Sequence, residues 1–534
     1  MALFKSAIGS SAFNSSEYRD ILRNMASDLG TFFSSALGNS MTKLIEDPHG
    51  NFTATSDGTT LIHELHLRYK HPIISLLLEA GDVQGRMHGD LAKMTIVLAC
   101  NLVIGALSLM DQGVHPTNVK NGFYRSSQQV MQQIAQMKRI NSIVVSAVQS
   151  ELEAFLALRL SPAVARHLAN LVGRPFAEFL HRNIQKLAQG SIDSVMVDLL
   201  DEIGMLIHPG GQIVDSFIFP GTGIIKDPVS WKEIWTALDL SRVENIRVAF
   251  VTGELYLDKK RIDSMDVKCT STDGHQLFKE GLEQVWINKA PKLLQKKVNV
   301  LVTEKGIDDA LISALQASIP PVLIFKRTKI DEMKRMARYL GGNLVYDIDH
   351  LEDSDLGYAK TMHAQQIRND MGFFFVNEES PSFYTLVIRG AFYDICDAVK
   401  QNLTSAMRSM LSSVHGGILN DFPYMLTKIV KDSRGVKDPS MQGKAALAMD
   451  VFLDAMDSLP RSMAINQGFD PYDTAVTSTF VGLNVPVDAV KSMIEIATSI
   501  ATSLIGVDAL FVNKEGWQKR IGKNPTPASR QEKS

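Results

Sequence analysis

The sequence predicts a multidomain α+β protein in which an α/β block is inserted between two helical regions. Its 534 residues exceed what one hydrophobic core usually supports, so two to four domains are expected. Helical periodicity dominates from residue 15 to about residue 190 and returns from Tyr393 onward. Between these regions, apolar strand-like runs alternate with helical patterns, which is typical of a parallel α/β layer.

The N-terminal region is predicted to contain a helix followed by a hairpin. Apolar residues recur with helical spacing over residues 15–37, and Ser15 or Ser16 is the expected N-cap. Residues 41–65 contain short extended runs separated by turn sequences at 47–50 and 56–58, so we expect these runs to pair as a hairpin.

The apolar stretch from Met94 to Met110 resembles a membrane span, but we expect it to be a helix buried in a protein core. It is shorter than the roughly 20 residues that a bilayer requires, and it contains Asn101 and Gly105. A helix that is apolar on nearly all sides is also typical of a buried central helix, which is what we expect here. Farther along, Ser161 followed by Pro162 predicts the start of another helix.

The middle of the chain carries the strand signals. The predicted strands are Arg247–Thr252, Val298–Thr303, Val322–Lys326, Asn343–Ile348, Gly372–Val376 and Thr385–Arg389. Helical patterns at Ile307–Ile319 and Ile330–Leu340 separate the second, third and fourth of these strands. This alternation predicts that the strands before residue 350 are parallel.

Composition excludes several classes of partner and site. A net charge of −3 gives no electrostatic footprint for nucleic acid or for an anionic membrane, so neither is expected as a partner. Cys100, Cys269 and Cys396 are scattered without a CxxC pair, so no disulfide framework or thiolate metal site is predicted. The N-terminus lacks a secretory pattern, and we expect a cytoplasmic protein.

Short glycine-containing turns recur in widely separated parts of the chain. Glycine lets a backbone approach a phosphate closely, and backbone N–H groups supply the donors. Taken alone, each piece would be a helix end or an ordinary turn. The pieces are Leu37-Gly38, Ser56-Asp57-Gly58, Gly89-Asp90, His415-Gly416-Gly417 and Asn466-Gln467-Gly468.

The order and spacing of these pieces resemble a group II chaperonin. The resemblance implies a chaperonin fold and an ATP site with Mg²⁺, in which Asp90 is the metal ligand. The residues that it implies for nucleotide binding are Gly38, Asp57, Gly58, Gly89, Asp90, Gly416, Gly417 and Gly468.

The sequence departs from the family's pattern at the positions that the resemblance implies for binding phosphate and hydrolysing ATP. Ser405 stands where the family keeps its catalytic aspartate, and no other catalytic residue is predicted. A hydroxyl without an adjacent base cannot orient or deprotonate an attacking water as a carboxylate can. Leu91, Ala92, Lys93 and Met94 replace a glycine and threonines that hold phosphates, and Val485 replaces an acidic residue. We therefore expect absent or very slow hydrolysis, with Lys93 as a partly compensating cation.

The resemblance also implies three domains built from five segments. A mainly helical equatorial domain would contain 1–140 and 402–534, and a small intermediate domain would contain 141–205 and 357–401. An α/β apical domain would span 206–356, with a helical lid protrusion near Asp258–Gln284.

In function, the resemblance implies one subunit of a hetero-oligomeric double ring, with sibling chaperonin subunits and unfolded proteins such as actin and tubulin as partners. The alternative is a chaperonin-like scaffold or assembly factor outside the folding ring, because loss of the ATP site suits both. An unrelated enzyme is disfavoured, since no nucleophile–base pair emerges. His63-Glu64-Leu65-His66 is one residue short of a zinc-protease motif, so no metal is expected there.

Overall fold

The structure is a computed structural model that divides into two compact units. Unit 1 is drawn from residues 1–169, 183–193 and 401–534, and unit 2 from 170–182 and 194–400. Unit 2 is therefore inserted into the chain of unit 1. The residues that the structure describes are 10–38, 43–46, 52–55, 57–68, 71–136, 143–189, 191–230, 243–256, 281, 283–377, 382–435, 443–470 and 483–513.

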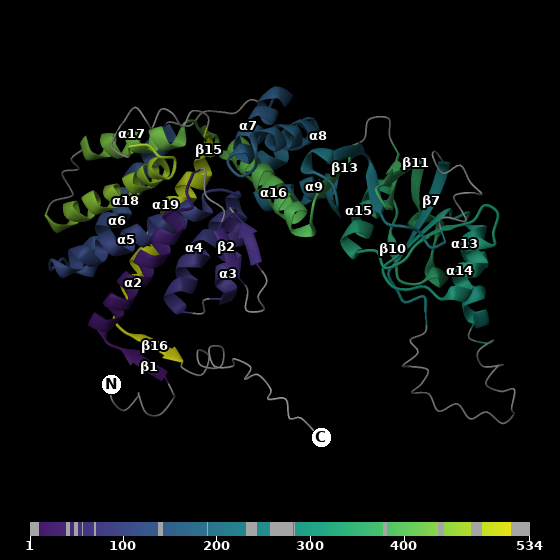
Figure 1. Ribbon diagram of the computed structural model, residues 1–534, viewed down its shortest axis with the longest axis horizontal. Coiled ribbons are helices and arrows are strands. Elements are labelled where there is room, and N and C mark those ends of the chain that lie inside the picture. The colour runs from purple at the N-terminus through teal and green to yellow at the C-terminus, as the bar shows by residue number, and fades with distance from the viewer. Residues whose placement is uncertain are drawn as a thin grey trace, which may run out of the picture. The chain divides into compact units, whose positions relative to one another are not determined.

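Unit 1 is a helical unit arranged around one central apolar helix. Helix α5 (Ala92–Asp111) packs against α2, α4, α18 and α19 (Figure 1). The helices that lie wholly within unit 1 besides α5 are α2 (Ser15–Ser34), α3 (Gly58–Arg68), α4 (Pro72–His88), α6 (Pro116–Gln136), α7 (Val145–Ala157), α17 (Phe422–Gly435), α18 (Lys444–Asn466) and α19 (Val487–Leu504), among the described residues. Helix α5 is long and apolar enough to span a membrane, and it is the only described helix of which this is true. Most of it is, however, buried inside the unit. The prediction of a buried central helix is confirmed.

The described residues of unit 1 form three antiparallel strand pairs. Strand β1 (Ser10–Phe13) pairs with β16 (Leu510–Asn513), and β2 (Lys43–Glu46) pairs with β3 (Phe52–Thr55) as a local hairpin. Strand β14 (Ile418–Leu419) pairs with β15 (Val485–Pro486). The first pair brings segments from opposite ends of the chain together.

Two local predictions in the N-terminal region are wrong. The extended run does not continue to residue 65, because α3 begins at Gly58 and buries Leu61, Ile62 and Leu65 at helical spacing. The N-cap of α2 is Asn14 instead of Ser15 or Ser16. Asn14 and Glu17 form a reciprocal capping box, which satisfies two backbone N–H groups at once.

Three long helices contribute residues to both units. They are α8 (Pro162–Gln189), α9 (Ile192–Glu202) and α16 (Tyr393–Gly416). Helix α8 begins at Pro162, as the Ser-Pro signal predicted.

Unit 2 contains two sheets. The larger has the strand order β6-β12-β11-β7-β8-β9, with β10 beside β7, and the smaller has the order β4-β13-β5. The strands are β4 (Ile203–Pro209), β5 (Phe217–Pro220), β6 (Thr222–Ile225), β7 (Val243–Val251), β8 (Val300–Thr303), β9 (Leu323–Phe325), β10 (Leu344–Val345), β11 (Gly357–Ile367), β12 (Asp370–Val376) and β13 (Tyr384–Gly390). Strands β10, β7, β8 and β9 are parallel, which confirms the predicted parallel layer.

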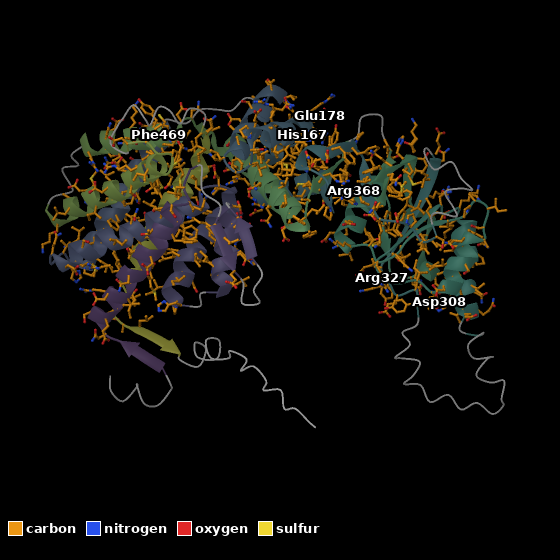
Figure 2. The ribbon with its side chains drawn as sticks, viewed as in Figure 1. His167, Glu178, Asp308, Arg327, Arg368 and Phe469 are labelled. Carbon is orange, nitrogen blue, oxygen red and sulfur yellow. The ribbon has the colours of Figure 1, made fainter. Side chains whose placement is uncertain are left out.

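Short helices connect the strands of unit 2. They are α13 (Ala290–Gln295), α14 (Asp309–Gln316), α15 (Ile330–Leu340) and the 3-10 turns η1 (Ile213–Asp215), η2 (Ile348–His350) and η3 (Asp353–Asp355). Asp308, labelled in Figure 2, caps α14, because its carboxylate accepts the Ala310 N–H at 3.0 Å.

The predicted division into five segments stays a prediction. The boundary proposed between residues 356 and 357 runs through the larger sheet, because β11 and β12 pair with strands from before that boundary. Most of the predicted lid, Asp258–Gln284, lies outside the described residues, as does Cys269. Cys100 and Cys396 are buried free thiols.

Candidate functional site

Five of the eight residues predicted to bind nucleotide line one cavity in unit 1. They are Gly38, Asp57, Gly58, Gly89 and Asp90. The cavity has a volume of about 70 Å³. The rest of its lining comes from Leu37, Thr59, Leu91, Ala92, Lys93, Met94, Leu158, Arg159, Met463, Leu483 and Val485. Chain segments more than 400 residues apart in sequence therefore meet at one place.

The other three predicted residues, Gly416, Gly417 and Gly468, do not line this cavity. Gly417 closes the end of α16, where its N–H donates to the Ser413 carbonyl at 2.9 Å. Gly468 adopts a φ of +80° just after α18. Their role in binding nucleotide stays a prediction.

Gly38 is held in place by the end of α18. The Asn466 side-chain amide donates to the Ser34 carbonyl at 2.7 Å and to the Leu37 carbonyl at 2.9 Å. Gly38 itself has a φ of +75°, which favours glycine. The turn after α2 is therefore fixed against the end of α18 by hydrogen bonds from the Asn466 side chain to backbone carbonyls of that turn.

Asp57 caps helix α3 from within the cavity wall. Its carboxylate accepts the Thr60 N–H at 2.9 Å and the Thr60 hydroxyl at 3.2 Å, and the residue is 4% exposed. Burial alone would raise the pKa of Asp57. The charge of Arg159 and the hydrogen bonds from Thr60 and Thr59 outweigh burial and hold that pKa below its usual value. Asp57 is therefore an ionised carboxylate with most of its acceptor capacity in use.

The Gly89-Asp90 turn joins α4 to α5. Gly89 has a φ of +71°, and a Cβ atom there would lie 2.5 Å from the Ser405 carbonyl oxygen, so only glycine fits. The Asp90 carboxylate accepts the Leu91 N–H at 2.8 Å. Burial raises the pKa of Asp90, although the charge of Arg159 opposes that shift.

The segment after Asp90 presents apolar side chains at the start of α5. Leu91 adopts a left-handed φ of +62°, which is uncommon for a residue other than glycine, and its side chain is buried. Helix α5 then begins at Ala92 without any side-chain cap. Apolar bulk and the loss of hydroxyl donors both weaken phosphate binding at this helix start.

The Arg159 guanidinium lies beside both carboxylates of the cavity. The Arg159 Nη2 atom lies 3.6 Å from Asp90 Oδ1, and its Nε atom lies 4.0 Å from Asp57 Oδ1. The Arg159 guanidinium also stacks on the Phe155 ring, 4.1 Å from its centroid. Sequence reasoning missed Arg159, because nothing in its position after α7 indicates contact with residues 57 and 90.

The Lys93 side chain runs across Gly58. A Cβ atom on Gly58 would meet Lys93 Cγ at 2.9 Å and Cδ at 3.5 Å. Burial lowers the pKa of Lys93 to about 8, the Arg159 charge adds to this shift, and Asp57 and Asp90 oppose it. Lys93 therefore fills the space above the glycine that would otherwise give a ligand access to the backbone.

Ser405 lies on the part of α16 that belongs to unit 1, and its carbonyl packs against Gly89. Thr60 donates to the Gln401 side chain at 2.7 Å and fixes the same part of α16 to α3. Residues 401–416 contain no aspartate or glutamate. This helix face therefore offers no carboxylate to activate a water molecule.

The donor set does not fit Mg²⁺. Magnesium is usually held by one or two carboxylates together with substrate phosphates. Among the described residues, Asp57 and Asp90 are the only carboxylates that line the cavity, and the Arg159 guanidinium already lies within 4.0 Å of both. Within the described ranges, no group of three or more His, Cys, Asp or Glu side chains is placed to hold a metal, His63 and His66 included.

Comparison with known proteins adds an independent line of support. The model of the TCP-1/cpn60 chaperonin family matches residues 29–477. The thermosome subunit beta of Sulfolobus acidocaldarius is 27% identical over 501 residues, which covers 88% of this chain and 86% of the relative. The corresponding subunit of Sulfurisphaera tokodaii is 26% identical over 525 residues, covering 92% and 90%.

A family match over most of the chain agrees with the mixed helical and sheet architecture and with the cavity assembled from both ends of the sequence. The chain belongs to the TCP-1/cpn60 chaperonin family, as a subunit similar to those of thermosomes.

Proposed function

We propose that this chain is a subunit of a hetero-oligomeric double-ring chaperonin and that its own ATP site is deficient in hydrolysis. The observation that carries the second part is the cavity itself. The backbone turns at Gly38 and Gly89 are retained, whereas the catalytic position is Ser405 and Lys93 covers Gly58. The site keeps the geometry on which the fold depends and lacks the groups on which hydrolysis depends.

Loss of hydrolysis is compatible with a role in a ring whose other subunits hydrolyse ATP. In such a ring this subunit would supply structure, asymmetry and surface for unfolded proteins. Actin and tubulin are the proposed clients, and the cytoplasm is the proposed location. Ile62–Leu65 and Leu459–Ala464 resemble the theta subunit of the eukaryotic cytosolic chaperonin, which supports that assignment within the family.

Restoring the missing carboxylate should not restore activity. The Ser405→Asp variant returns a carboxylate to α16, but Leu91 and Lys93 still occupy the phosphate-binding region. We expect its ATP turnover to stay at the background of the unmutated protein. Turnover regained by this single change would show that only the catalytic group was missing.

Ring membership is tested by the native mass and composition of the complex isolated from its own cells at low salt. We expect a particle near a megadalton that contains several sibling chaperonin subunits. A monomer or a small complex would instead place the chain among chaperonin-like scaffolds that act outside a folding ring.

A further inference from the structure

The positive charge in the cavity matches what a divalent cation would supply. Arg159 lies within 4.0 Å of both carboxylates, at Asp57 Oδ1 and Asp90 Oδ1. Lys93 brings a second cationic group to the same carboxylates, which favour its charged form. Two basic side chains therefore accompany two carboxyl groups, and their formal charges balance without any bound ion.

The packing around the two carboxylates also disfavours a bound divalent ion. The alkyl part of Lys93 lies over Gly58, beside Asp57, so the face of Asp57 toward Gly58 is covered. The remaining acceptor capacity of Asp57 is directed to Thr60, and Asp90 accepts the Leu91 N–H. A hydrated divalent ion would need several of these contacts to break before it could bind.

We infer that Lys93 and Arg159 are built-in counter-cations that take the place of the divalent ion, so that this subunit's site excludes Mg²⁺. This inference rests on the proposed degenerate ATP site and specifies why that site would not bind Mg²⁺. Lys93 is the decisive residue, because its side chain both covers Gly58 and carries a charge toward Asp57 and Asp90. Ring membership does not depend on it.

The test is titration of the purified full-length protein with Mn²⁺ alone. Binding is measured as the change in the relaxation rate of water protons. Mn²⁺ is paramagnetic and binds carboxylate oxygens as Mg²⁺ does. We expect the unmutated protein to show no site with a Kd below about 1 mM. The Lys93→Thr variant removes the covering chain and its charge, and we expect it to bind Mn²⁺ at least about tenfold more tightly.

Lys43→Thr is the matched control. Lys43 lies on β2, where its ammonium donates to the Ser35 hydroxyl at 2.9 Å, and it does not line the cavity. Removing its charge should change Mn²⁺ affinity by less than about twofold. A gain equal to that of Lys93→Thr would show that any loss of positive charge increases metal binding, and would overturn the role of Lys93.

A single Mn²⁺ site in the unmutated protein with a Kd below about 1 mM, lost in Asp90→Asn, would overturn the inference. The presence or absence of such a site in the unmutated protein can be measured without any variant, and Asp90→Asn only assigns the site to the cavity. A native particle that contains sibling subunits, together with such a site, would leave the proposed ring membership intact and reject only the exclusion of metal.

Discussion

Two guanidinium groups, that of buried Arg335 in unit 2 and that of partly buried Arg159 in unit 1, show the difference between a structural brace and a charge placed in a site. In unit 2, Arg335 donates to the Asp201 and Tyr384 carbonyls, each at 3.1 Å, and to the Thr385 hydroxyl. In unit 1, Arg159 approaches its carboxylates no closer than 3.6 Å, and its buried Nη1 atom has no hydrogen-bond partner among the described residues.

The two arginines also differ in what surrounds them. Arg335 is 7% exposed and joins α15 to the smaller sheet, and burial lowers its pKa to about 10. Arg159 lines a cavity together with turns that resemble a nucleotide site. A buried charge whose donors are met by backbone carbonyls indicates a structural role, whereas a loosely paired charge in a cavity indicates a former or altered binding site.

The largest effect on stability should come from removing the Arg335 side chain. Arg335→Met deletes the donors to two carbonyls and a hydroxyl in unit 2, and we expect a loss of about 3 kcal/mol in the free energy of unfolding. Hydrogen exchange of peptides from β4 and β13 should rise accordingly. Arg335→Lys keeps the charge but lacks the forked donor geometry, so it should recover only part of the loss. A loss below about 1 kcal/mol for Arg335→Met would contradict the structural role.

A loss of similar or slightly smaller size is expected at the turn that shapes the cavity. Gly89→Ala combines an unfavourable left-handed backbone with a clash against the Ser405 carbonyl, and we expect a cost of about 2–3 kcal/mol. The control is Gly113→Ala, where φ is +83° and no atom lies within 4 Å of the new Cβ. It should cost about 1 kcal/mol in the same denaturant titration. Equal costs would mean that the contact between Gly89 and α16 is unimportant.

Arg159 should matter less to stability than Arg335. Arg159→Leu removes a cation that lies 3.6–4.0 Å from two carboxylates, but it keeps apolar contact with Phe155, so we expect a loss of about 1–2 kcal/mol. Denaturant unfolding of this variant beside Arg335→Met compares the two sites directly. A cost for Arg159→Leu equal to that for Arg335→Met would remove the distinction between site and brace.

The smallest effect concerns acid sensitivity of unit 1. Burial lowers the pKa of His88, whose Nδ1 atom lies 2.9 Å from the Ser412 hydroxyl. Below about pH 6.5 the unfolded chain binds a proton that folded His88 does not, so stability falls as the pH drops through this window. We expect His88→Gln to lose less thermal stability than the unmutated protein between pH 7.5 and pH 5.5. Identical losses would show that His88 is not a source of the acid sensitivity.

The sequence was sufficient for the residues whose role is local. Gly89 and Gly38 were identified from their turns, and the strands near residues 250, 300 and 324 were identified from short apolar runs. Asp57 was expected in a hairpin turn, but it caps α3, because the helical spacing after it decides the structure. Arg159 could not be found from sequence, because its contacts with Asp57 and Asp90 exist only after α7 packs beside the cavity.

The measurement that tests the central claim most directly is ATP turnover by the purified protein with Mg²⁺ present. The account predicts turnover indistinguishable from a blank without protein, because Ser405 supplies no carboxylate and two side-chain cations face Asp57 and Asp90. Mg²⁺-dependent turnover that disappears in Asp57→Asn would contradict it and would show that the altered cavity still hydrolyses nucleotide.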